Sequence, residues 1–142
     1  MNEVWQDKIP PQDIEAEQAV LGAIFLDSDT LIDAMEIVTP RSFYRRSHQI
    51  IFQSMIQLSN RGEAIDLVTL KAEIEKSNAL EDIGGISYLS ELSQSTPSSA
   101  SVSYYAKIVD DKSLLRQLIQ TANQIVVKSF EQGEEVQAIV DE

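Results

Sequence analysis

The segment PRSFYRRSH holds the one concentrated group of cationic side chains in the sequence, Arg41, Arg45 and Arg46, beside Phe43 and Tyr44. Guanidinium groups next to aromatic rings are a combination that binds the phosphates and bases of single-stranded nucleic acid. The alternative is a loop in which Phe43 and Tyr44 pack into the core while the arginines pair with carboxylates. We favour this alternative, because three arginines are a weak electrostatic footprint in an acidic chain.

No residue pattern predicts catalysis or a bound cofactor. His48 is the only histidine, so neither a multi-histidine metal site nor a two-histidine relay is expected, and a structural or merely exposed role is favoured. The chain lacks cysteine, and none of its five glycines precedes Lys-Ser or Lys-Thr, which excludes a cysteine nucleophile and a phosphate loop. The many carboxylates are scattered along predicted helices, where solvated surfaces are expected. We therefore expect no catalytic, cofactor-binding or metal-binding residue.

Composition and charge limit the classes of partner. The chain has 142 residues, 43% of them hydrophobic, which is enough for one compact domain with a core. Its 23 acidic and 11 basic residues give a net charge of −12, which opposes binding to a phosphate backbone. Nucleic acid is therefore not expected to bind this chain alone. The sequence has no export signal and no apolar run near the roughly 20 residues that span a bilayer, so we expect a cytoplasmic protein.

Apolar residues recur at helical spacing almost everywhere, which predicts an all-α fold without strands. A compact bundle of about five to six short helices is expected first. Asp13 and Asp66 have the side chain and position of helix N-caps, and Gly84-Gly85 is expected to turn the chain before a helix restarts.

The same spacing predicts which faces of two short helices are buried. In the helix after Gly85, Ile86, Leu89 and Leu92 are expected to point inward. Tyr88 then lies roughly 200° from Ile86 at 100° per residue, which predicts an exposed aromatic ring suited to a partner protein. An ordinary half-buried tyrosine is the alternative. The predicted buried face of the helix near residue 30 consists of Leu31, Ile32, Met35 and Val38.

Residues 101–130 contain neither glycine nor proline, which predicts one helix on the order of 45 Å long at 1.5 Å per residue. Its apolar residues, many at seven-residue spacing, predict a stripe that pairs with another helix. A break at residues 132–133 and the apolar residues after it predict a hairpin, whose second helix is expected to be cut short at the end of the sequence. We expect a globular domain over residues 1–98 and a hairpin for self-association over residues 99–142. The expected contact residues are Leu115, Leu118, Ile119, Ala122, Ile125 and Val126.

Five stretches of the sequence resemble the N-terminal domain of the bacterial DnaB-type replicative DNA helicase family. They are IPPQDIEAEQAVLGAIF, SFYRRSHQIIF, AIDLVTL, IGGISYLSELSQSTPSSASVSYYAKIV and LLRQLIQTANQI. The resemblance covers residues 9–142 in the family's order and spacing. One departure is SFY, where many members carry an acidic residue before FY. A single stretch is weak evidence, but five in register are specific.

The resemblance implies a collar and docking platform without enzymatic activity of its own. In this family the N-terminal domains pair through helical hairpins into a trimer of dimers, above a hexameric ring of RecA-like ATPase domains that unwinds DNA. The collar receives the helical C-terminal domain of the DnaG-type primase. ATP, magnesium and DNA are expected to bind only the ATPase domain, beyond a linker that follows this sequence. A helicase loader is a further candidate partner.

Two residues are the expected primase-docking contacts, Glu15 at the start of the first helix and Tyr88 near the Gly84-Gly85 turn. Two rival functions remain open beside this one. The first is a weak single-stranded nucleic-acid-binding module that uses Arg41, Arg45 and Arg46, with binding that weakens steeply with salt. The second is a stand-alone helical adaptor or dimerisation domain unrelated to replication. Neither rival accounts for all five stretches.

Overall fold

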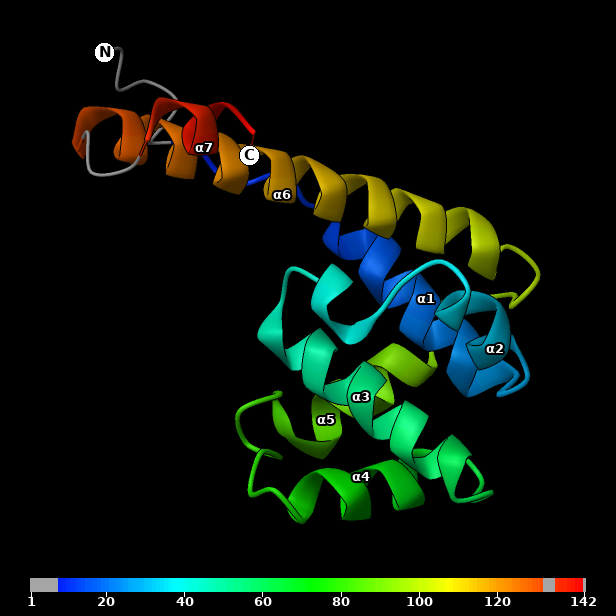
Figure 1. The fold of residues 1–142 in the computed structure, drawn as a ribbon. Helices are drawn as coiled ribbons and strands as arrows, with labels where there is room; N and C mark the ends of the chain where they lie inside the picture. Colours follow the sequence, from blue (N-terminus) through cyan, green and yellow to red (C-terminus); the bar gives the residue numbers. More distant parts are fainter. Residues whose placement is uncertain (1–7, 132–134, 142) are drawn as a thin grey trace.

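The computed structural model describes residues 8–131 and 135–141, and this part of the chain is helical, without a strand. Figure 1 shows a head of short helices, α1 to α5, with the long helix α6 crossing one side of the head and continuing beyond it. The predicted all-α fold class is confirmed. The elements are α1 (Ile14–Leu26), α2 (Thr30–Met35), the 3-10 turn η2 (Pro40–Ser42), α3 (Arg46–Asn60), α4 (Leu67–Glu75), α5 (Gly85–Ser93), α6 (Val102–Glu131) and α7 (Val136–Val140).

Local capping signals set the starts of α1 and α4, as predicted. The carboxylate of Asp13 accepts a hydrogen bond from the backbone N–H of Ala16 at 3.0 Å. Asp66 and Thr69 form a reciprocal capping box, with each side chain bonded to the other's backbone N–H at 2.9 Å. Such caps satisfy N–H groups that have no partner within the helix, and each stabilises it by about 1 kcal/mol.

The Gly84-Gly85 turn has the backbone conformation that only glycine adopts readily. The φ angles are +102° at Gly84 and +72° at Gly85, in the left-handed region where a Cβ atom is strained. This turn ends the segment after α4 and starts α5, as the sequence predicts.

Helix α3 lies in the middle of the head, and its buried residues Ile51, Phe52 and Met55 form the centre of the core. Helix α1 packs between α3, α5 and α6. Gly22 lets the segment after α5 approach α1 closely, because a Cβ atom at this position would lie 2.6 Å from the hydroxyl oxygens of both Ser95 and Thr96. The segment after α5 is therefore held against α1.

The predicted buried face of α2 is partly wrong. Leu31 and Val38 are buried as expected, but Ile32 and Met35 are exposed and Ala34 takes the inward position between them. The helix is only six residues long, so its inward side is set by Leu31 and Ala34, one turn apart, and not by a wide apolar face.

Helix α6 has 30 residues in one unbroken run, which confirms the predicted long helix and corresponds to about 45 Å. Its first third belongs to the head, because Val102, Ala106 and Val109 are buried in the core cluster. Its last part continues past the head, and α7 packs back against it. The predicted break at residues 132–133 lies outside the described residues.

Candidate interaction surfaces

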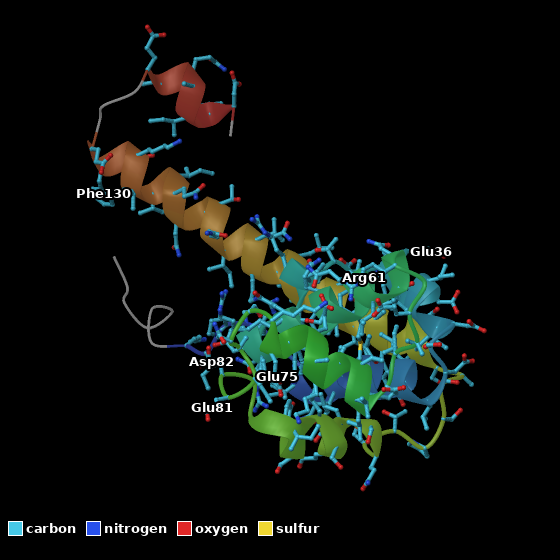
Figure 2. The ribbon with its side chains drawn as sticks, turned by 90° about the horizontal axis from the view of Figure 1, so that it is seen from below. Glu36, Arg61, Glu75, Glu81, Asp82 and Phe130 are labelled. Carbon is cyan, nitrogen blue, oxygen red and sulfur yellow. The ribbon has the colours of Figure 1, made fainter. Side chains whose placement is uncertain are left out.

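The outer part of α6 carries apolar side chains that the head does not cover. Leu115, Leu118 and Ile119 are exposed, with Leu118 at 65% of its maximum. Phe130 is 74% exposed at the far end of the helix, away from the head (Figure 2). Of the other predicted contact residues, Ala122 is exposed, whereas Ile125 and Val126 are half-buried. No helix of the described residues therefore covers Leu115, Leu118, Ile119 and Ala122, the four predicted positions that are exposed.

An open groove of about 830 Å³ runs beside this part of α6. One wall is the segment from Lys8 to Pro11, and the other consists of α6 residues that include Ile119, Val126 and Val127. The predicted stripe and this groove are therefore continuous through Ile119 and Val126. The apolar surface available to a partner is wider than a single row of helix residues.

Arg116 fastens α6 to the head at the point where the exposed stripe begins. Its guanidinium donates to the backbone carbonyls of Pro11 and Ser42, both at 2.8 Å. The same guanidinium lies over the ring of Tyr44, 5.4 Å from its centroid. The role of Arg116 was not predicted from the sequence. The only sequence feature that points to it is a cation among the apolar positions of a long helix.

Tyr88 is not the outward-pointing residue that the helical wheel predicts. It is half-buried against the core, and its hydroxyl lies 2.5 Å from Nε2 of His48 and 3.2 Å from Nε2 of Gln18. The rings of Tyr88 and His48 stack with centroids 5.8 Å apart. Ile86, expected inside, is 43% exposed. Helix α5 is therefore rotated so that Tyr88 and Leu89 face the head, because the hydroxyl finds buried partners there.

His48 and Glu17 form the buried centre of this hydrogen-bond network. Nδ1 of His48 lies 2.7 Å from a carboxylate oxygen of Glu17, and both residues are at most 1% exposed. The carboxylate also accepts the backbone N–H groups of Tyr44 at 2.7 Å and Arg45 at 3.4 Å. The predicted structural role of His48 is confirmed. Glu17 is an exception to the prediction that carboxylates lie on solvated surfaces.

One set of proton positions satisfies the whole network. Gln18 donates its amide N–H to the Tyr88 oxygen, and the Tyr88 hydroxyl donates to Nε2 of His48. Nδ1–H of His48 then donates to Glu17. Within residues 8–131 and 135–141, no buried side-chain nitrogen or oxygen lacks a hydrogen-bond partner. A saturated network of this kind rigidifies the head.

Glu15 lies close to this network but outside it. Its side chain is exposed in the first turn of α1 and borders a shallow hollow of about 350 Å³ that Gln18 also lines. Gln18 is bonded to Tyr88, so the two predicted docking residues share Gln18 as a neighbour. Tyr88 itself does not line the hollow.

The basic segment, PRSFYRRSH at residues 40–48, does not have the packed and paired side chains that we favoured. Phe43 is fully buried as expected, but Tyr44 remains 38% exposed. Arg41, Arg45 and Arg46 are exposed, and no carboxylate of the described residues forms a salt bridge with any of them. The predicted pairing with carboxylates is therefore wrong for the part of the chain that the structure describes.

The described residues offer neither a metal site nor a membrane-spanning helix. They hold no group of three or more histidine, cysteine or acidic side chains placed to bind a metal ion. None of their helices has the length and hydropathy needed to cross a membrane. The function of this chain is therefore argued from the interaction surfaces described above.

Comparison with known proteins identifies the family. The model of the family described as DnaB-like helicase N terminal domain matches residues 9–111. The chain belongs to this family. The replicative DNA helicase DnaB of Geobacillus stearothermophilus is 51% identical to this DnaB-like domain over 142 residues, a match that covers all of this chain and 31% of that protein. The resemblance of the five sequence stretches is thereby confirmed.

Solved structures of the same family share the fold. The crystal structure of the N-terminal domain of DnaB helicase from Mycobacterium tuberculosis matches with a TM-score of 0.89 and 39% identity, over 94% of each chain. A DnaB-like replicative helicase, whose structure is described together with its interactions with primase, matches with a TM-score of 0.71 and 26% identity. That match covers 91% of this chain and 33% of the other. Our DnaB-like domain thus spans about a third of the curated relative's length.

Proposed function

We propose that this chain is the N-terminal interaction domain of a bacterial replicative DNA helicase, which assembles copies of the helicase and docks its primase. The observation that carries the proposal is the outer part of α6, which continues past the head with exposed Leu118 and Phe130. When a partner covers an apolar stripe on a projecting helix, each Å² of apolar surface removed from water stabilises the complex by about 25 cal/mol. Together with α7, this part of α6 suits a helix from a second copy.

The self-association surface contains the six predicted residues and the groove beside them. A second copy brings the same stripe, and two such stripes pack as coiled-coil-like seams do. The groove adds Ile9 and Val127 to the buried area. We assign Leu115, Leu118, Ile119 and Ala122 to the centre of this contact, because they are exposed here, and Ile125 and Val126 to its edge.

The docking surface for primase is assigned to the side of the head that holds Glu15 and Tyr88. Support comes from the related DnaB-like helicase described with its primase interactions, and from the acidic charge of −12, which favours a protein partner over a phosphate backbone. The Tyr88 hydroxyl is bonded to His48 and Gln18. A partner therefore meets the ring of Tyr88 and the free carboxylate of Glu15.

Catalysis is assigned to the rest of the helicase. This sequence contains no phosphate loop, so ATP and Mg²⁺ would bind in an ATPase domain and DNA unwinding would occur there. We place the protein in the bacterial cytoplasm at the replication fork, and a helicase loader is a further partner in the proposal. The residues of this chain contribute assembly and docking.

Light scattering of the chain over a concentration series tests the self-association. We expect the average mass to rise above the 15.9 kDa of one chain as concentration increases, and to stay at one chain for Leu118→Asp, because a desolvated carboxylate in an apolar contact has no partner. Val68→Asp is the matched control, since Val68 is also exposed, at 77%, but lies on α4 of the head. Equal masses for the parent and Leu118→Asp at every concentration would contradict the proposed contact.

A further inference from the structure

Four of the five arginines of this acidic chain lie within the segment from Pro40 to Arg46 or contact it. Arg41 lies in η2, Arg45 and Arg46 start α3, and Arg116 reaches the same segment from α6 through the carbonyl of Ser42. The remaining arginine, Arg61, lies at the other end of α3 and is paired with carboxylates. The chain has 23 acidic residues, yet none from the described ranges forms a salt bridge with these four.

The carboxylate nearest to this segment is already committed to other groups. Glu17 accepts the backbone N–H groups of Tyr44 and Arg45, and it is bonded to His48. It is buried beneath the segment, so it holds the backbone while the guanidinium groups of Arg41, Arg45 and Arg46 remain in solvent. Among the residues that the structure describes, these three cations therefore have no carboxylate partner.

Tyr44 adds an aromatic ring that is both exposed and fixed. The guanidinium of Arg116 lies over the ring, 5.4 Å from its centroid, and two backbone carbonyls hold that guanidinium in place at 2.8 Å. Tyr44 as a whole is 38% exposed. A planar group held in this way can stack on a base with little loss of side-chain entropy.

A groove of about 500 Å³ continues from Arg46 along α3. It is lined by Gln49, Gln53 and Gln57, which follow one another at helical spacing, and on the α4 side by Glu73 and Lys76, which form a salt bridge with each other. Gln49 bonds the carbonyl of Phe43, whereas the exposed amides of Gln53 and Gln57 make no hydrogen bond within residues 8–131 and 135–141. These amides can both donate and accept, as the edges of bases require.

We propose that this surface binds single-stranded DNA, with Arg41, Arg45 and Arg46 on phosphates, Tyr44 on a base, and the amides of the α3 groove on base edges. An acidic peptide would use the arginines but would leave the exposed ring and the glutamine amides without a role. This inference goes beyond the proposed docking function. It also departs from the expectation of no nucleic-acid binding, which relied on the net charge of the whole chain and not on the local arrangement of these arginines.

The binding is weak and sensitive to salt. The net charge of −12 opposes a polyanion, although charges more than about 8 Å away are largely screened at physiological ionic strength. Three phosphate contacts to a single strand give a slope of log affinity against log salt of about −2, at about −0.7 for each contact. A steep slope near −10 would require far more cations than this face holds.

Fluorescence anisotropy with a labelled oligothymidine of about 20 nucleotides, longer than the roughly 4–16 that such sites cover, tests the proposal. The complete 142-residue chain is titrated between about 50 and 200 mM salt. We expect saturable binding with the shallow slope given above, weakened at least about tenfold by Arg45→Glu combined with Arg46→Glu. The matched control is Lys71→Glu combined with Lys107→Glu, which changes the net charge equally at two exposed lysines, one on α4 and one on α6.

Three results would overturn the assignment. One is no saturable binding at the lowest salt concentration, and another is equal weakening by the arginine pair and the lysine pair. The third comes from a comparison that separates nucleic acid from an acidic protein. We expect a glutamate peptide with the same number of charges to displace the oligonucleotide poorly, and we expect Tyr44→Leu to weaken binding of the oligonucleotide but not of the peptide. If the peptide competes equally and Tyr44→Leu has no effect, the surface binds anionic protein and not DNA.

Discussion

A carboxylate oxygen of Glu17 on α1 lies 2.7 Å from Nδ1 of His48 on α3, and both side chains are buried. Through Tyr88 the same network reaches α5, and through the N–H of Tyr44 it fixes the segment before α3. Three helices of the head are therefore joined by one chain of hydrogen bonds. Removing a member leaves the others buried without partners, which costs more than the bond itself is worth.

Glu17→Leu should lower the free energy of unfolding by about 2–4 kcal/mol, because His48 and the N–H of Tyr44 lose their acceptor. Glu15→Leu is the matched control on the same helix, since Glu15 is exposed, and should change it by at most about 0.5 kcal/mol. Urea unfolding at neutral pH measures both. Similar midpoints for the two variants would show that the network does not stabilise the head.

Tyr88→Phe separates the hydroxyl of Tyr88 from its ring. The change leaves Nε2 of His48 and the amide of Gln18 without the oxygen that both contact, so we expect a loss of about 1–3 kcal/mol. Tyr88→Ala also removes a half-buried ring and should lose more. Urea unfolding is again the measurement, and a Phe variant as stable as the parent would place the hydroxyl outside the network.

Arg116→Met keeps most of the apolar stem and removes the guanidinium that holds α6 to the head. Two bonds to the carbonyls of Pro11 and Ser42 and the contact with the Tyr44 ring are lost, which predicts a loss of about 2–3 kcal/mol. Gln120→Met, at an exposed position of the same helix, is the control. Hydrogen exchange should increase for the middle of α6 in the first variant alone, and unchanged exchange would contradict the fastening role.

The Arg61 cluster predicts a specific dependence of stability on pH. The hydrogen bonds from Arg61 lower the pKa of Glu73 and of Glu63 from the ordinary value of 4.5, and Lys76 also bonds Glu73. A carboxylate with a lowered pKa in the folded state stabilises the protein above its unfolded pKa, and this contribution is lost as the pH falls through the folded value. The stability difference between the parent and Arg61→Leu should therefore be constant near neutrality.

The same difference should shrink as the pH falls below about 4.5, the ordinary carboxyl value. Urea midpoints of both proteins at a series of pH values provide the measurement. A difference that stays constant down to the acid transition would mean that the contacts of Arg61 with Glu63 and Glu73 do not hold in solution.

Local signals made much of the fold predictable from the sequence. The caps at Asp13 and Asp66, the glycine pair at residues 84–85 and the run without glycine or proline in α6 each act within a few residues. Such signals depend on the backbone of the element itself. The sequence therefore predicted where these helices start and how long α6 is.

Contacts between distant residues were not predictable in this way. Glu17 and His48 are 31 residues apart, His48 and Tyr88 are 40 apart, and Arg116 binds a carbonyl 105 residues away. Helical periodicity assigned Tyr88 to the outer face, because it weighs apolar neighbours and takes no account of a buried histidine that can pair with a hydroxyl. The arginines of the basic segment were expected to pair with carboxylates for a similar reason, since their partners had to be assumed from composition.

Calorimetric titration of the chain with the helical C-terminal domain of its DnaG-type primase tests the docking function most directly. The proposal predicts saturable binding that Glu15→Lys weakens, because the substitution reverses a free charge on the docking side of the head, whereas Lys71→Glu on α4 leaves binding unchanged. Absence of saturable heat at tens of micromolar primase domain, from a chain that self-associates by light scattering, would contradict the assignment of this domain as the primase platform.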